Sequence, residues 1–112
     1  MSGLQLNRRL VLEAPTRLVD GAGGYRETWE PLGEVWADVS ARGGREAAQA
    51  SVPISRMGFA ITVRAAPFGS PERPQPQQRF REGTRVFKIQ TVAEQDQDAR
   101  YLVCLAQEEV VV

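Results

Sequence analysis

The chain has 112 residues, of which 42% are hydrophobic, and its 14 basic and 14 acidic side chains leave no net charge. This length suits a single domain, predicted here over residues 1–112, and a surface without net charge argues against binding of free duplex DNA by bulk electrostatics. The sequence has no histidine, which removes the usual general base and the commonest metal ligand, and so argues against metal-dependent and nucleophilic enzymes.

The N-terminal residues 1–15 do not form the uninterrupted apolar stretch of a signal peptide, because Asn7, Arg8 and Arg9 divide it. No later run approaches the roughly 20 apolar residues that a membrane helix needs. We therefore expect a protein that is made and kept in the cytoplasm and has no membrane partner.

Apolar and polar residues alternate along three segments of the N-terminal half, which predicts strands there. These strands cover residues 8–14, 25–30 and 34–41. Between the first two, the glycines of residues 20–24 provide the positive φ values that a chain reversal needs. We expect Pro15 to end the first strand, and Pro31 with Gly33 to separate the second from the third.

Trp29 and Trp36 lie on the second and third of these strands. A buried aromatic side chain removes about 150–250 Å² from water, so we expect both tryptophans to anchor the core. The alternative is a role at an interface, because tryptophan is enriched among binding hot spots.

Residues 42–51 change character, with two glycines followed by the sequence REAAQA over residues 45–50. These six residues have good helix propensity, and a helix so short needs packing against another element to be stable. The segment is interpreted as a long excursion between strands that carries one short helical piece.

Strands are predicted again in the C-terminal half, over residues 58–66, 84–92 and 100–107. The last two form a hairpin, and the proline-rich residues 67–83 read as a long loop, because proline cannot donate to a sheet ladder. The predicted fold class is therefore all-β: a small antiparallel barrel or sandwich with long loops and one short helical segment.

Neither the cysteine nor the paired carboxylates point to catalysis. Cys104 lies in the apolar run YLVCLA, which predicts a small buried core residue rather than a reactive thiol. Asp96 and Asp98 form the best candidate for a glycosidase-like pair, but they lie in a polar turn where solvated carboxylates are the default. We expect no enzyme activity, catalytic residue, metal or cofactor.

Four short patterns follow one another along the chain: G-G-x-x-x-T-W, V-W-A, G-x-E and R-V-F-x-I. They lie within DGAGGYRETW, VWADV, GGREAAQA and REGTRVFKIQTV, and between the last two comes the strand FAITVR. In this order they resemble the head–tail joining proteins of long-tailed phages and gene transfer agents, also called head-closure or stopper proteins. The resemblance spans nearly the whole chain.

This resemblance implies a compact β-barrel that assembles with copies of itself into a ring, six- or twelve-fold, below the portal and its adaptor protein. Such a ring closes the filled head, docks a tail terminator or tail tube protein, and lets DNA pass through its channel without sequence preference. The protein would be assembled in the host cytoplasm and then lie in the neck of the particle.

Two groups of residues are candidates for these contacts. The resemblance implies that the excursion faces the channel, through Arg42, Gly43, Gly44, Arg45 and Glu46.

A closed ring needs contacts between different patches of one subunit. We expect the basic middle of the chain to meet its acidic C-terminal region across subunits, although a solvated mixed surface explains the same charges. The residues concerned are Arg73, Arg79, Arg81, Arg85 and Lys88 on the basic side, and Glu94, Asp96, Asp98, Glu108 and Glu109 on the acidic side.

Two other classes of protein remain open at this point. One is a generic β-barrel module for protein interaction, and the other is a small hydrolase, which would need a pocket holding a carboxylate with a perturbed pKa.

Overall fold

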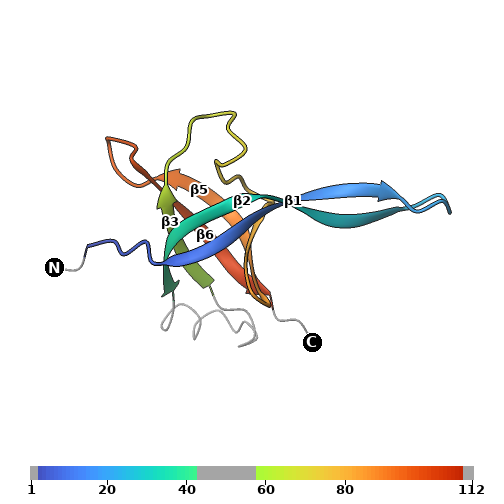
Figure 1. The fold of residues 1–112 in the computed structure, drawn as a ribbon, viewed down its shortest axis with the longest axis horizontal. Coiled ribbons are helices and arrows are strands. Elements are labelled where there is room, and N and C mark those ends of the chain that lie inside the picture. Colours follow the sequence, from blue (N-terminus) through green and yellow to red (C-terminus); the bar gives the residue numbers. More distant parts are fainter. Residues whose placement is uncertain (1–2, 43–57, 110–112) are drawn as a thin grey trace.

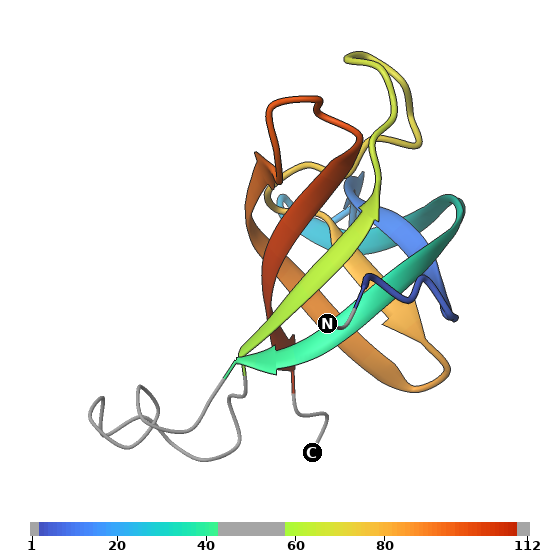
Figure 2. The same cartoon turned by 90° about the vertical axis from the view of Figure 1, so that its left-hand side faces the viewer.

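The computed structural model describes residues 3–42 and 58–109, which form six antiparallel strands closed into one barrel (Figures 1 and 2). Around the barrel the strands follow the order β1-β2-β3-β6-β5-β4. Their bounds are β1 Arg8–Val19, β2 Tyr25–Arg42, β3 Gly58–Arg64, β4 Arg79–Glu82, β5 Arg85–Glu94 and β6 Tyr101–Glu109. The all-β antiparallel class is confirmed, while the helical segment expected over residues 45–50 lies outside the described residues. Over the described residues no helix is long and apolar enough to span a membrane.

The hairpin of β1 and β2 is longer than the barrel. The two strands pair along their whole shared length, from Arg8 opposite Ala37 to Val19 opposite Tyr25. Of the other strands, β4 reaches β1 only as far as Glu13, and β3 pairs with β2 only from Ala37 onward. The outer part, residues 14–19 and 25–30, is therefore a two-stranded ribbon that projects from the barrel (Figure 1). We call it the arm.

The expected breaks at the prolines are wrong. β1 continues through Pro15 to Val19, because beyond Glu13 it has only one neighbouring strand, and such an edge tolerates a residue without an N–H group. β2 likewise continues through Pro31. There the register shifts, so that Leu12 faces Gly33 while Glu13 faces Pro31, and Leu32 is the extra residue of a β-bulge. The bulge absorbs the irregularity without ending the strand.

The expectation of one long loop over residues 67–83 is also wrong at its end, where β4 forms. Its four residues pair with β5 on one side and with β1 on the other, and so close the barrel. Gly83, with a φ of 61°, forms the tight turn that joins β4 to β5. So short a strand, next to a run of prolines, gives almost no alternating pattern to detect.

Alternating apolar side chains fill the barrel, as the sequence predicts for β1, β3 and β5. Both faces of β6 are apolar in the sequence, and its buried side chains are Leu102, Cys104 and Ala106. The pairs Leu10 with Leu12 and Phe87 with Ile89 are each at most 1% exposed. Within the core, the rings of Phe59 and Phe87 meet edge to face, with 5.1 Å between their centroids. The core cluster is made of Leu10, Leu12, Ala37, Phe59, Ile61, Val63, Phe80, Phe87, Ile89, Leu102, Cys104 and Ala106.

We predict that Phe87→Ala lowers the free energy of unfolding by about 3–5 kcal/mol, because it leaves a cavity against Phe59 at the centre of the core. The matched control is Phe68→Ala, since Phe68 is 81% exposed and touches Arg73 alone among the ring contacts of the described residues. We expect that control to cost no more than about 1 kcal/mol. Denaturant titration followed by tryptophan fluorescence measures both, and equal losses would contradict the core assignment.

Candidate assembly surfaces

The side chains first considered for chemistry lie in unreactive surroundings. Cys104 is buried, and desolvation raises the pKa of its thiol to about 12, so the thiol stays protonated at neutral pH. Asp96 and Asp98 lie in the exposed turn between β5 and β6, where Asp98 is 3.8 Å from Arg100. In the described part of the chain no group of three or more Cys, Asp and Glu residues is placed to hold a metal ion.

One end of the barrel is closed by four charged side chains. Arg8, Glu82, Arg85 and Glu108 each lie two residues along a strand from a core residue, and so belong to the inner face. Arg8 donates from Nε to Glu82 at 3.0 Å, and Arg85 donates to both carboxylate oxygens of Glu108 at 2.8 and 3.0 Å. We call this group the inner charge cluster.

Aromatic rings lie under the inner charge cluster. The guanidinium carbon of Arg85 is 4.9 Å from the centroid of Phe87 and 5.7 Å from that of Phe59, so the cation rests on the top of the core. The hydrogen bond from Arg8 lowers the pKa of Glu82, and that from Arg85 lowers the pKa of Glu108. The two arginines and two glutamates neutralise one another inside one chain.

A second cluster lies on the outer face where β1 meets β4. Glu13 is only 5% exposed, and it accepts hydrogen bonds from Arg79 at 2.7 Å and from Arg81 at 2.9 Å. Burial by itself raises the pKa of Glu13, but the two arginine hydrogen bonds outweigh it, and the pKa lies below its ordinary value. Trp29 covers Arg79, with 4.1 Å between the guanidinium carbon and the ring centroid.

The residues predicted to meet across subunits are already paired in part. Arg81 contacts Glu13, and Arg85 contacts Glu108, both within the same chain. Asp96, Asp98 and Glu109 are exposed. Their contact with a second subunit stays a prediction, and for the two arginines it would have to add to ion pairs that the chain already makes. Glu13, which is the internal partner, gave no sequence signal of its own.

Of the residues expected to face the channel, the structure describes Arg42. Arg42 is the last residue of β2 and is exposed, at the same end of the barrel as the inner charge cluster. Gly43, Gly44, Arg45 and Glu46 lie outside the described residues. Their placement in a channel stays a prediction.

Neither tryptophan belongs to the core, so that part of the expectation is wrong. Trp29 is half-buried over Arg79, and the side chain of Trp36 is 55% exposed. Their alternation with neighbours was identified correctly, but the bulge and the outer face of β2 direct both rings outward. The interface role stays a prediction.

The arm carries apolar side chains into solvent at its tip. Leu18, Val19 and Tyr25 are 50%, 73% and 67% exposed. Asp20 orders the turn between the strands, because its carboxylate accepts hydrogen bonds from the amides of Ala22 and Gly24 at 2.8 and 3.0 Å. These same bonds lower the pKa of Asp20, that from Ala22 the most.

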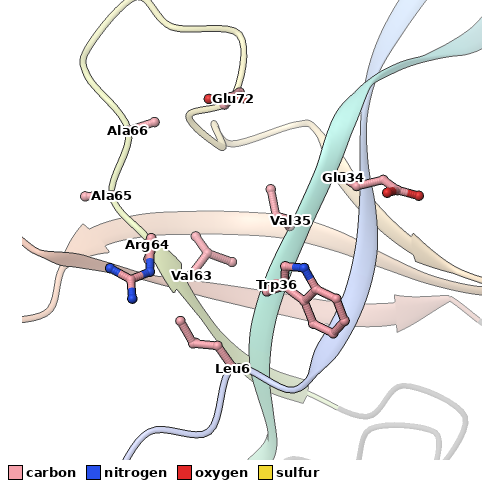
Figure 3. Close-up of a pocket in the computed structure, with 9 residues that line it drawn as sticks. All are labelled: Leu6, Glu34, Val35, Trp36, Val63, Arg64, Ala65, Ala66 and Glu72. Carbon is pink, nitrogen blue, oxygen red and sulfur yellow. The ribbon is translucent and has the colours of Figure 1, made fainter.

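Trp36 borders a pocket of about 240 Å³ beside the start of β1 (Figure 3). Three segments enclose it: the N-terminal residues before β1, the middle of β2, and the chain that follows β3. Its lining combines apolar side chains with three charged ones, and consists of Leu6, Glu34, Val35, Trp36, Val63, Arg64, Ala65, Ala66 and Glu72. We call it the Trp36 pocket.

Apolar side chains are exposed at the tip of the arm and at the Trp36 pocket, and the arginines of both charge clusters are paired with glutamates of the same chain. Residues 1–109 match the family of phage head completion proteins. The chain belongs to this family. The resemblance inferred from the sequence is thereby confirmed.

Two solved structures resemble this head completion protein along nearly its whole length. A chain of the virion of a native gene transfer agent particle is 54% identical, with a TM-score of 0.77 and coverage of 95% of this chain and 96% of that one. A protein of Shigella flexneri 2a, known from its solution structure, is 23% identical with a TM-score of 0.68 and 96% coverage of both chains, and shows the fold alone. The search of curated proteins returned no match.

We predict that Glu13→Gln lowers the free energy of unfolding of the head completion protein by about 1–3 kcal/mol, because two guanidinium groups then face each other without their shared counter-charge. The matched control is Glu34→Gln. Glu34 is 3.8 Å from Arg9, and both side chains are largely exposed, so we expect its loss to fall within experimental error. Denaturant titration measures both variants, and similar values would contradict the role assigned to Glu13.

We also predict that the protein loses stability in acid. Glu13, Glu82 and Glu108 have folded-state pKa values below the ordinary 4.5, so the native state binds their protons more weakly than the unfolded chain does. Their contribution is fully present above about pH 4.5 and is lost as the pH falls further. Thermal unfolding at stepwise lower pH measures this. Glu82→Gln with Glu108→Gln should give a flatter slope below that pH, and an unchanged slope would contradict the assignment.

Proposed function

We propose that this chain is a structural component of the neck of a tailed phage or gene transfer agent particle, where copies form a ring that closes the DNA channel and docks the tail. The single observation that carries this proposal is the 54% identity, over 95% of the chain, to a chain of a gene transfer agent virion. Membership of the head completion family supports the same role.

The charges of the chain suit such a position. A protein that lines a DNA channel must let the DNA slide, and each strong contact with a phosphate group raises the affinity for DNA. The net charge is zero, and four arginines of the described barrel are held by glutamates of the same chain: Arg8, Arg79, Arg81 and Arg85. Their charge is thus largely screened from a passing phosphate backbone. Weak and sequence-blind contact through Arg42 and Arg45 is part of the proposal.

The partners follow from the position in the neck. On the head side the ring would meet the portal adaptor, and on the tail side the tail terminator or tail tube protein. The subunit offers separate features for such contacts, namely the arm, the Trp36 pocket, and the charged end of the barrel at which β2 ends with Arg42. The ring would be assembled in the cytoplasm of the producing cell.

We predict that particles made without this chain contain packaged heads that lose their DNA and carry no tails, because nothing closes the portal or presents a docking face. Electron microscopy counts heads without tails, and nuclease-resistant DNA measures retention. Restoring the gene in trans should restore both, and Phe68→Ala serves as a folded, exposed-site control. If particles made without the chain carry tails and retain their DNA, the proposal is contradicted and a generic interaction module is favoured instead.

A further inference from the structure

Two apolar features of the surface have no partner within the described chain, and they lie on separate parts of the molecule, the arm and the barrel. The tip of the arm carries Leu18, Val19 and Tyr25. The Trp36 pocket includes Leu6, from the N-terminal segment that points the other way along the longest axis (Figure 1). In Figure 2 this N-terminal segment faces the viewer, while the arm points away.

The tip is ordered rather than loose, which makes its exposed side chains suitable for docking. Asp20 holds the turn through two backbone amides, and the Thr16 and Thr28 hydroxyl groups are hydrogen-bonded across the strands. The guanidinium group of Arg17 lies over the ring of Tyr25, 6.0 Å from its centroid. A preordered tip loses little conformational entropy when it binds.

The Trp36 pocket has the complementary properties. It is concave and large enough for one or two side chains of the tip, and its walls are formed by Trp36, Val63 and the alanines after β3 (Figure 3). Half of the Trp36 side chain is exposed, and a tryptophan of this kind gains from burial at an interface.

The charges beside the two features also match. Arg26 is exposed on the arm, in the register position opposite Leu18, and Glu72 lines the pocket. Among the described residues, neither of these two side chains makes an ion pair. Glu34 and Arg64 also line the pocket, with charges of opposite sign, and Glu34 is 3.8 Å from Arg9.

We propose that the arm of one copy docks its tip, with Tyr25 and Val19, into the Trp36 pocket of the next copy, and that Arg26 then faces Glu72. The inference rests on the proposed ring function and specifies its contact. Because the two patches differ and lie on separate parts of one subunit, the contact runs head to tail, which is the type that generates a ring when its rotation closes.

Cysteine cross-linking in assembled particles tests this contact. Ala22 lies in the turn of the arm and Ala66 lines the pocket, so Ala22→Cys with Ala66→Cys places one thiol on each feature. The native Cys104 is buried and does not compete. A short thiol-specific cross-linker should give a ladder of multimers on a denaturing gel, because every chain has one arm and one pocket.

The matched control replaces the second site. Ala22→Cys with Ala93→Cys places the second thiol on an exposed position of β5, away from the pocket lining, and should give no ladder. A chain that stays monomeric, stops at dimers, or links its arm to a different particle protein overturns the inference. Mass spectrometry of the same particles distinguishes failure of the proposed function from failure of the arm contact. If the chain is absent from the particles, the proposed function is contradicted. If the chain is present but gives no ladder, only the arm contact is contradicted.

A charge exchange in the Ala22→Cys, Ala66→Cys background tests the polar part of the contact. Arg26→Glu alone or Glu72→Arg alone should reduce the ladder about two- to fivefold, in line with one exposed ion pair, and the two changes together should restore it. Failure of the double change to recover more than either single change overturns the pairing of Arg26 with Glu72.

Discussion

The pairing of β1 with β4 is the constraint on which the rest of the structure depends, because it closes the barrel with only three residue pairs. On the inner face Leu12 lies opposite Phe80, and both are at most 1% exposed. On the outer face Glu13 is shared by Arg79 and Arg81. So short a ladder has few backbone hydrogen bonds, and it is therefore secured by apolar contact on one side and by charge on the other.

Closure of the barrel determines which glutamate each of the paired arginines contacts. Arg8 meets Glu82 on a strand 74 residues away, and Arg85 meets Glu108 on the neighbouring strand β6. These four side chains are neutralised within the chain, which leaves exposed apolar side chains at the tip of the arm and around Trp36 beside other, solvated charges. A barrel that holds separate apolar features suits a protein whose work is assembly.

Several elements could be predicted from the sequence because their signal is local. Phe59, Ile61 and Val63 alternate without interruption, and β3 formed where the pattern predicted it. The four motifs spread over the chain were enough to indicate the head completion family. β4 was missed because its four residues follow a run of prolines, and the continuity of β1 and β2 was missed because Pro15 and Pro31 normally interrupt ladders.

By itself the sequence determined the all-β class, the core faces of β1, β3 and β5, the burial of Cys104, and the family. Both faces of β6 are apolar, and only the structure shows that Leu102, Cys104 and Ala106 face the core. Only the tertiary structure decided that Trp29 stacks on Arg79, that Trp36 borders a pocket, and which carboxylate each arginine meets. The reason is physical. Alternation along a strand is a property of neighbouring residues, whereas the partner of an outward side chain depends on register across strands. Between β1 and β2 that register shifts at the bulge of Leu32.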